Sequence, residues 1–597
     1  MADIPRRTVL DASLSSLADR AGAPPGARGA VPLQVATTRD LLGEPPLPSP
    51  ERVSLKLLVA ETEAEASQAW VEGQGGQVLS SRANVLVAEL PPEALSGLEG
   101  CPGIRRAEAP RQLQANLDEA RGPATGLQAA LQSFPLDGQG VVVGLVDTGL
   151  DWRHPDFQNP NGSSRLELFA HAHFDQATQR STFDQFDPAA LDAALGGGGA
   201  VPQGDPMGHG THCASIAAGN GLASNGRYRG VAPGAALMAV RSEPLLDTHT
   251  IWGIRRIFEL AGARPAVVSL SLGSHLGPHD GTTAIENVIA RESGPGRIVV
   301  VAAGNEGGDR IHFRGELTAG QELVIPVRID DPSFQFVDVW VVRGDEVSVL
   351  IETPDGAQHP ADGQEVRTVF GTFEAHFQED PINRDQNLTL FVAGGRRNHI
   401  WKIRLAAARV VHGEVHAWAG SNNGSSQLFG DGADSDFTVG MPGTEERAVT
   451  VASVVSKNRF ETAQGVLSTP GLAVGGLSPF SSRGPTRYGG LKPDIAAPGQ
   501  YITAALAGGS EMATQPRFLQ RHDPSGRYIS IQGTSMATPF VAGLIALLLQ
   551  REPRLTPEEI QQRLRITARR DAQTGRVWDR GWGFGKLDAA ALLAYQG

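Results

Sequence analysis

The chain has 597 residues, of which 40% are hydrophobic and 72 are glycine, so its length and composition suggest several globular domains rich in loops. Its formal net charge of -13 and its pI near 5.6 argue against nucleic acid as the main partner, because nucleic-acid binding needs a basic surface. The two cysteines, Cys101 and Cys213, do not suggest a disulfide framework.

The N-terminal segment shows no targeting signal. Residues 1–21 carry charged side chains and no apolar core of signal-peptide length, and no later apolar run reaches the ~18 residues of a membrane span. We therefore expect a protein without a membrane partner that is cytoplasmic, or is exported without a classical signal peptide. Residues 1–52 are rich in Pro, Ala and Gly, which predicts a flexible leader.

Residues 53–115 have the pattern of a small α+β domain. Strands are expected from residue 53 and at 77–81, 84–90 and 104–107, with helices at 61–72 and 91–99. This order predicts a split βαβ domain of ferredoxin-like type.

From residue 138 the pattern becomes alternating strands and helices. Continuous β-branched runs at 141–146, 267–272 and 298–301 are typical of buried parallel strands, and helices are expected at 212–218, 252–261 and 282–291. The predicted fold class is α/β, with a doubly wound, mostly parallel sheet built from residues 116–307 and 437–597.

Residues 308–436 interrupt this pattern with strand signals alone. Strands are expected at 323–329, 336–342, 347–352, 366–377, 388–392, 400–405 and 411–418. The segment is therefore predicted to be an inserted β-sandwich or jelly roll, whose two ends lie close together on the α/β domain.

One stretch places a serine at the start of an apolar helix. Residues 533–539 read Gly-Thr-Ser-Met-Ala-Thr-Pro, and we expect Ser535 at the helix terminus and Pro539 in the first turn. Backbone N–H groups at such a terminus can stabilise an oxyanion, as acyl transfer requires. The alternative is that Ser535 is a helix N-cap.

Two further motifs supply the partners that such a serine needs. Asp147 follows the strand at 141–146, and His209 lies in Gly-His-Gly-Thr-His at 208–212. An imidazole can accept the proton of a serine hydroxyl while a carboxylate orients it. An aspartic protease is disfavoured because there is no second Asp-Thr-Gly, and a metal at His209 and His212 is a minor alternative because no H-E-x-x-H occurs.

A fourth motif provides an amide at the same edge of the sheet. Asn305 follows the strand at 298–301 in Ala-Ala-Gly-Asn-Glu-Gly, and its side chain can donate to an oxyanion together with the backbone N–H of Ser535. The alternative is a turn-forming asparagine, but four such motifs in this order make that interpretation weak.

Together these motifs resemble the signature blocks of the subtilisin-like serine proteases, the subtilases, over residues 138–307 and 437–595. The resemblance implies that Asp147, His209 and Ser535 form a catalytic triad and that Asn305 is the oxyanion donor. It also implies that a peptide substrate pairs with two segments of the cleft, and that Gly440 lies at the floor of the S1 pocket, which receives the substrate residue P1. The implied cleft residues are Ser271, Leu272, Gly273, Ala302, Ala303 and Gly304.

The family resemblance extends to the other domains. Residues 53–115 resemble the inhibitory propeptide, which implies an intramolecular inhibitor and self-cleavage within about residues 108–124. The insertion resembles the jelly roll of the spore-germination subtilases, and Cys213 resembles the thiol packed behind the histidine in thiol-containing subtilases. Asp156 matches one calcium ligand of the family, but the loop at 219–230 is basic and has no carboxylate, so no cofactor is predicted and calcium is doubtful.

The sequence therefore predicts a serine endopeptidase that hydrolyses protein or peptide substrates through an acyl-enzyme on Ser535 and is made as a self-processing zymogen. The alternatives are a catalytically silent protein that binds a partner through the sandwich, and a ligase on the same fold. The preference at P1 stays open. Glu306 could favour a basic or polar P1 side chain, or it could be only a solvated loop charge, whereas the open floor at Gly440 suits a large apolar side chain.

Overall fold

The computed structural model describes residues 53–596 with gaps at 83–84, 109–117, 122–123, 176–179, 330–333, 381, 395–398, 422–426 and 429–431. The predicted leader at 1–52, and much of the predicted self-cleavage segment, lie outside the described residues. The chain divides into two compact units, Met1–Leu113 and Gln114–Gly597.

The first unit is a four-stranded antiparallel sheet in the order β2-β3-β1-β4. Its connections contain one α-helix and one long 3-10 helix. The second helix was expected to be α-helical, but Ser96, Gly97 and Gly100 are weak helix formers and this stretch winds more tightly. The elements are β1 (Val53–Val59), η2 (Glu61–Glu63), α3 (Ala64–Gly73), β2 (Gln77–Arg82), β3 (Val85–Leu90), η3 (Pro92–Gly100) and β4 (Ile104–Glu108).

The second unit contains an eight-stranded sheet in the order β26-β23-β10-β9-β5-β8-β6-β7, in which only β7 runs antiparallel. This arrangement confirms the predicted α/β fold with a mostly parallel sheet. Its strands are β5 (Val142–Asp147), β6 (Leu166–Asp175), β7 (Arg180–Phe186), β8 (Ala236–Glu243), β9 (Ala266–Leu270), β10 (Arg297–Ala302), β23 (Val449–Val454) and β26 (Ile495–Pro498).

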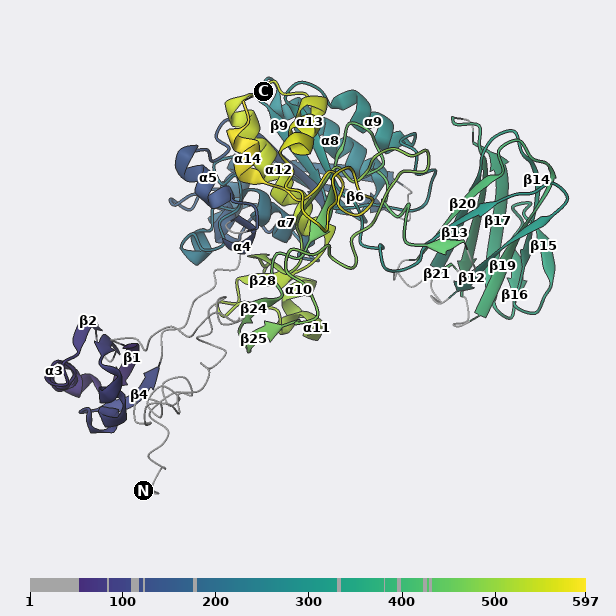
Figure 1. Ribbon diagram of the computed structural model, residues 1–597. Helices are drawn as coiled ribbons and strands as arrows, with labels where there is room; N and C mark the ends of the chain where they lie inside the picture. The colour runs from purple at the N-terminus through teal and green to yellow at the C-terminus, as the bar shows by residue number, and fades with distance from the viewer. Residues whose placement is uncertain are drawn as a thin grey trace. The chain divides into compact units, whose positions relative to one another are not determined.

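Helices cover both faces of this sheet, which explains why its central strands are apolar throughout. Alternate residues of β5 enter different cores: Val143 packs with the helices α7 and α12, and Val142 packs with α8 and α9. Figure 1 labels these four helices beside the sheet. The helix bounds are α7 (His209–Ala218), α8 (Asp247–Ala261), α9 (Ala284–Glu292) and α12 (Thr534–Arg551).

The helix α12 is the centre of the larger core. It has a mean hydropathy of 1.2 and would be long and apolar enough to cross a membrane, but 89% of it is buried inside the fold, so it is a core helix. Because it begins at Thr534, Pro539 is its sixth residue and not part of its first turn as expected. Pro539 has no N–H to donate four residues back, so the carbonyl of Ser535 lacks its helical partner.

The insertion is a sandwich of two antiparallel sheets, in the orders β16-β17-β18-β13-β20-β11-β22 and β15-β14-β19-β12-β21. Figure 1 shows these strands gathered without helices among them. The strands are β11 (His312–Glu316), β12 (Glu322–Ile329), β13 (Phe334–Val341), β14 (Glu346–Glu352), β15 (Gln358–Pro360), β16 (Val366–Thr368), β17 (Gly371–Glu379), β18 (Gln386–Ala393), β19 (His399–Arg409), β20 (Glu414–Ser421), β21 (Gln427–Leu428) and β22 (Ala433–Asp434).

The sandwich has its own core, which includes Trp401 and Ile403 from one sheet and Val337 and Leu390 from the other. Its first and last strands pair directly, with His312 opposite Asp434, so the two ends of the insertion lie side by side. The single strand expected at 366–377 is a hairpin of β16 and β17, because the chain turns at Val369 and Phe370.

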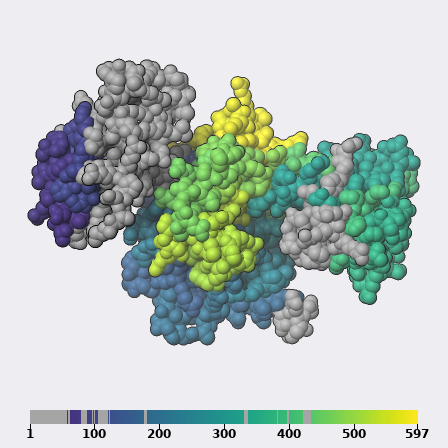
Figure 2. All heavy atoms as spheres, turned by 90° about the horizontal axis from the view of Figure 1, so that it is seen from below, coloured from purple at the N-terminus to yellow at the C-terminus, as the bar shows by residue number. Residues whose placement is uncertain are grey.

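The remaining elements pack around the α/β sheet. In Figure 2 the segments that carry β24–β25 and β28 lie side by side, and Ala463 N donates to the carbonyl oxygen of His522 at 2.8 Å. These elements are α4 (Asp118–Arg121), α5 (Leu127–Ser133), η4 (Pro155–Phe157), α6 (Pro188–Leu195), η5 (Leu222–Ser224), β24 (Arg459–Thr462), β25 (Gly465–Ser468), β27 (Ile502–Ala505), α10 (Glu511–Thr514), α11 (Pro516–Leu519), β28 (Tyr528–Ile531), α13 (Pro557–Thr567) and α14 (Ala589–Ala594).

Candidate active site

Asp147 and His209 meet at the carboxyl edge of the parallel sheet. Asp147 is the last residue of β5, and its Oδ1 lies 2.7 Å from His209 Nδ1 at the start of α7. The same oxygen accepts a 2.7 Å hydrogen bond from Thr148 N, which fixes the carboxylate. Asp147 is buried, whereas the His209 side chain is 19% exposed, so the imidazole is anchored on one side and reaches the surface on the other.

Asp205, which was not among the residues predicted for the site, holds the helix that carries His209. Its carboxylate accepts hydrogen bonds from Gly208 N and Thr211 N, both at 2.8 Å, and from the hydroxyls of Thr148 and Thr211. These bonds satisfy N–H groups of the first turn, and α7 therefore begins at His209 and not at residue 212 as expected. The signal in the sequence that could have revealed this role is the position of an acidic residue shortly before the helix.

Close backbone approach explains the glycines beside the two residues. A Cβ at Gly149 would lie 1.9 Å from the carbonyl oxygen of Gly204, and one at Gly210 would lie 2.0 Å from that of Gly149. A side chain at Gly210 would displace α7 from the end of β5, and one at Gly149 would displace the segment at Gly204 that leads into α7. The glycines thus allow the short contact between Asp147 and His209.

The electrostatic surroundings favour a charged imidazole. Burial opposes protonation of His209, but the Asp147 carboxylate outweighs it, so the pKa of His209 lies well above its ordinary value. An imidazole in this environment can take up a proton during a reaction and hold it.

Ser535 is the second residue of α12 and is 8% exposed. Its carbonyl, which Pro539 leaves without a helical partner, accepts hydrogen bonds from Ser271 Oγ at 2.9 Å and from Cys213 Sγ at 3.3 Å. Its hydroxyl donates to the carbonyl oxygen of Ser271 at 3.4 Å, which is a long contact that the hydroxyl can exchange for another acceptor. The backbone of the serine is therefore fixed from two other elements while its hydroxyl is weakly held.

Asn305 contacts the start of the same helix. Its Oδ1 accepts from Thr534 N at 2.9 Å and from Thr534 Oγ1 at 3.1 Å. Because the oxygen of the amide is used in this way, its NH₂ group is the part left to donate elsewhere. The structure brings the amide and the first turn of α12 together, as the sequence motifs suggested.

Glu306 is not a solvated loop charge. Its Oε2 accepts from Asn305 N at 2.6 Å and Ser482 Oγ at 3.1 Å, and lies 3.2 Å from His275 Nε2. Burial opposes its ionisation, but these contacts, the one from His275 foremost, outweigh burial and lower the pKa of Glu306. The carboxylate thus supports the backbone of Asn305.

The predicted cleft segments are joined by backbone hydrogen bonds. Gly440 N donates to the carbonyl oxygen of Ala303 at 2.9 Å, and Ser274 and Met441 exchange two bonds of 2.9 Å. A Cβ at Gly440 would lie 3.5 to 3.7 Å from Ser274 O and the ring of His275, so a side chain there would occupy the space beside His275. Of the predicted cleft residues, Ala303 accepts the bond from Gly440, and a Cβ at Gly273 would lie 3.2 Å from the carbonyl oxygen of Met441.

Cys213 lies behind the histidine. Its Sγ is 3.9 Å from His209 Nδ1, it is fully buried, and burial raises the pKa of its thiol. A buried thiol with a raised pKa is a poor nucleophile. Its position agrees with a packing role.

Two groups among the described residues bring three possible metal ligands within 4.8 Å of one another. The first is Asp147, His209 and Cys213, where the closest atoms already form the carboxylate–imidazole bond. The second is His171, His173 and Glu243, where Arg241 contacts the carboxylate. His212 does not join His209, because its Nε2 lies 3.1 Å from two carbonyl oxygens elsewhere and burial lowers its pKa to about 3.

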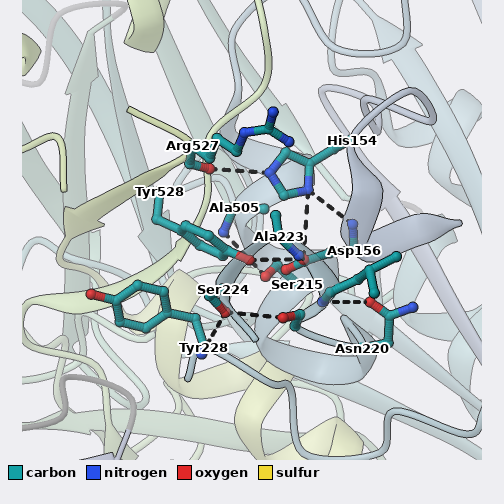
Figure 3. A network of polar contacts seen from close by, with 12 residues as sticks. His154, Asp156, Ser215, Asn220, Ala223, Ser224, Tyr228, Ala505, Arg527 and Tyr528 are labelled. Carbon is teal, nitrogen blue, oxygen red and sulfur yellow. Dashed lines mark hydrogen bonds and ion pairs between the residues drawn. The ribbon is translucent and has the colours of Figure 1, made fainter. Parts of the chain in front are cut away.

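A tyrosine and an arginine contact Asp156, the residue that matches a calcium ligand of the family. Figure 3 shows the hydroxyl of Tyr528 directed at this carboxylate; it donates at 2.8 Å, and Ala223 N donates at 3.1 Å. The other carboxylate oxygen has no partner among the described atoms. Arg165 donates to the carbonyl oxygens of Asp156 and Ala218, both at 2.9 Å, so a guanidinium already binds carbonyls that face this loop.

Comparisons with known proteins agree with this geometry. The model of the subtilase family, Peptidase S8, matches residues 138–328 and 391–585, which is more than half of the chain. The segment missing from the match, 329–390, falls inside the sandwich.

Two relatives of the chain are named as proteases. The chain is 26% identical over 487 residues to the serine protease AprX of Bacillus subtilis, covering 81% of this chain and 74% of AprX. It is 26% identical over 449 residues to the minor extracellular protease Vpr of the same organism, covering 72% of this chain and 48% of Vpr.

A solved structure shows the same fold. The CspB protease of Clostridium perfringens superposes with a TM-score of 0.64 at 23% identity, covering 80% of this chain and 96% of that one. With the family match and the contact between Asp147 and His209, it follows that the chain belongs to the subtilase family and is a subtilisin-like serine endopeptidase acting on protein or peptide substrates.

Proposed function

We propose that Asp147, His209 and Ser535 are the catalytic triad and that Asn305 is the side-chain donor of the oxyanion hole. The observation that carries this assignment is the 2.7 Å contact between Asp147 Oδ1 and His209 Nδ1. This contact occupies Nδ1 of the imidazole and leaves Nε2 to act as the base.

Acylation follows from this arrangement. Ser535 Oγ attacks the carbonyl carbon of the scissile bond while its proton passes to His209 Nε2, and Asp147 stabilises the imidazolium that forms. His209 then returns the proton to the leaving amine, and the acyl group stays on Ser535. A water molecule then attacks the acyl group with His209 as the base, and the carboxylic acid product leaves Ser535.

The oxyanion that develops in both steps needs fixed donors. The amide NH₂ of Asn305 is held in place because its oxygen is bound to Thr534. The backbone N–H of Ser535 lies in the first turn of α12, where N–H groups have no i−4 partner within the helix. Donors that are in position before the reaction cost no reorganisation when the charge appears.

The cleft segments support recognition of an extended peptide. We propose that residues 271–273 (Ser271, Leu272 and Gly273) pair with one side of the substrate backbone. Residues 302–304 border the P1 side chain, and Gly440 forms the floor of the S1 pocket. Backbone pairing provides affinity that depends little on the substrate sequence, and the pocket provides selectivity.

A serine-directed organophosphorus probe tests the assignment. The reagent should label the wild-type protein at Ser535, and labelling should disappear in His209→Ala, because the hydroxyl then lacks its base. Peptide mapping locates the adduct, and the buried hydroxyl of Ser530 serves as an internal control that stays unlabelled. Absence of label after removal of residues 1–113 would favour the alternative, a silent protein that binds a partner through the sandwich.

We propose that residues 53–115 act as an intramolecular inhibitor and that the chain is a zymogen. The support is the element order of this unit, two strand–helix–strand repeats in one antiparallel sheet, which is a compact body with its own buried cluster around Leu57, Val71 and Leu86. Self-cleavage within about residues 108–124 would release it.

We also propose that the enzyme needs no calcium at the loop beside Asp156, because Arg165 binds the carbonyl groups there. Treatment with a strong chelator should leave kcat/KM and the melting temperature unchanged, and adding calcium should raise neither. Steady-state kinetics and thermal unfolding of dialysed enzyme measure both. Activity that collapses in chelator and returns with calcium would contradict the proposal.

For localisation we propose either retention in the cytoplasm or export. The name of the relative Vpr describes that protein as extracellular, which supports export for this chain.

A further inference from the structure

Besides Ala302–Gly304, two separate segments of the chain pair beside Gly440, the proposed floor of the S1 pocket, and we call these two segments the S1 walls. One is the segment around Ser274 and His275 that follows β9, and the other is the segment from Val439 to Met441 that follows the sandwich. Their direct link is the pair of bonds between Ser274 and Met441. The width of the pocket therefore depends on whatever else fixes these segments to each other.

His279 connects the two walls. It is 1% exposed, its Nδ1 lies 3.0 Å from the carbonyl oxygen of Val439, and its Nε2 lies 3.3 Å from that of His275. Burial holds the pKa of this imidazole well below its ordinary value, so the neutral ring has one N–H and donates to one carbonyl at a time. A single ring thus spans the distance between the walls.

The backbone of His279 is also constrained. Its φ of 53° lies in the left-handed region, which is uncommon outside glycine, and its carbonyl accepts from Arg487 N at 3.0 Å. The neighbouring Asp280 pairs with the fully buried Arg487 at 3.0 Å, and Arg487 also pairs with Asp385 of the sandwich at 2.6 Å. Through Arg487, these ion pairs connect the segment around His279 to the inserted sandwich.

The sandwich contacts this segment with aromatic and acidic side chains. Trp418 of β20 stacks on His279 with ring centroids 4.0 Å apart and planes at 5°, and its Nε1 donates to the carbonyl oxygen of Phe437 at 2.9 Å. Asp338 of β13 accepts from Gly277 N at 2.8 Å. Trp418 therefore touches His279 and the chain just before Val439 at once.

The contacts continue from His279 to the oxyanion donor. The rings of His279 and His275 stack at 5.2 Å, His275 Nε2 lies 3.2 Å from Glu306 Oε2, and that oxygen accepts from Asn305 N. A displacement of the His279 ring changes the position of His275, which lies beside Gly440. Packed contacts of this kind transmit small shifts, since protein interiors have little free space.

We propose that His279 is a positioning residue that sets the separation of the S1 walls, and that the inserted sandwich determines P1 selectivity by holding His279 through Trp418. The proposal rests on the proposed function of the cleft. It assigns the insertion a role in substrate selectivity. The alternative is that the sandwich acts only as a brace, that is, it stabilises the α/β domain without affecting selectivity.

The test compares two fluorogenic peptides that differ only at P1, with Phe in one and Ala in the other. In His279→Asn, which tolerates the left-handed backbone but is too short to span both carbonyls, the ratio of kcat/KM for the two peptides should shift by about tenfold. Trp418→Leu should shift the ratio in the same direction, because it removes the stacking and the bond to Phe437. Active-site titration with a covalent serine reagent corrects each value for misfolded protein.

The matched control is His249→Asn. His249 is also fully buried and contacts Ser181 and Ser242 through its two nitrogens, but it lies on α8 away from these walls, so its variant should lose stability and keep the wild-type ratio. An unchanged ratio in both His279→Asn and Trp418→Leu, with active wild-type enzyme, would overturn the proposal and leave the sandwich as a brace. A wild-type enzyme that hydrolyses neither peptide would instead remove the proposed function of the site, and the inference with it.

Discussion

Ser535→Ala should lower kcat for peptide hydrolysis by about 10⁶-fold, a size taken from the loss known for the corresponding serine of subtilisin. The alanine has no hydroxyl to attack the substrate, while Asn305 and the N–H of residue 535 remain. A residual rate of about 10³-fold over water is therefore expected from the oxyanion hole and binding alone. Progress curves with a quenched fluorescent peptide measure the loss.

The matched control is Ser525→Ala, which removes an exposed serine whose hydroxyl contacts Asp523 in a turn before β28. It should retain wild-type kcat. A Ser535→Ala protein with more than about a tenth of wild-type kcat would show that another group is the nucleophile.

The same variant separates processing from catalysis. Wild-type protein should lose its N-terminal unit on storage, and Ser535→Ala should keep the full mass, because the acyl-enzyme needed for self-cleavage cannot form. Intact mass spectrometry of both proteins decides this. Equal masses would rule out self-processing without affecting the assignment of the nucleophile.

Asn305→Ala should lower kcat by about 10² to 10³-fold and leave KM nearly unchanged, a size taken from the equivalent amide of subtilisin. The amide donates to the oxyanion, which exists in the transition state and not in the bound substrate. The loss should therefore appear in kcat, and steady-state kinetics on a single peptide separate the two constants.

Stability must be followed in the same variant. Asn305 Oδ1 accepts from Thr534 N, so its removal leaves that group without its partner at a cost of about 1 to 3 kcal/mol. Thermal unfolding measures this cost, and Asn287→Ala, which removes an exposed amide on α9, is the control. An unchanged kcat in Asn305→Ala would exclude the amide from the mechanism.

The fold and the site motifs were accessible from the sequence because their signals are local. The apolar runs of β5, β9 and β10 identify buried parallel strands, and the residues around Asp147, His209 and Ser535 are short motifs at strand and helix ends. The family match confirms the fold class and the enzyme class that these signals predicted.

Other features depend on residues that are distant in the chain or on competing local signals. The start of α7 was placed too late because glycines surround His209 and the cap comes from Asp205. The sequence predicts Pro539 in a first turn, because a proline further inside a helix leaves one carbonyl without its helical partner. Here that carbonyl belongs to Ser535 and is bound by Ser271 and Cys213, which are distant in the chain. The stack of His279 on Trp418 joins residues 139 positions apart (418 minus 279), and no periodicity reveals such a contact.

The position of the insertion also affects the order in which the protein can be completed on the ribosome. Asp147, His209 and Asn305 emerge before the sandwich, while β23, β26 and Ser535 emerge after it. At typical rates of synthesis, the 144 residues from Asn305 to Val449 (449 minus 305) take on the order of ten seconds, enough for a domain with its own core to fold. The large core needs α12 and its neighbours β9, β10 and β23, so it closes last. A nascent chain therefore carries the proposed base and the sandwich long before it has the proposed nucleophile.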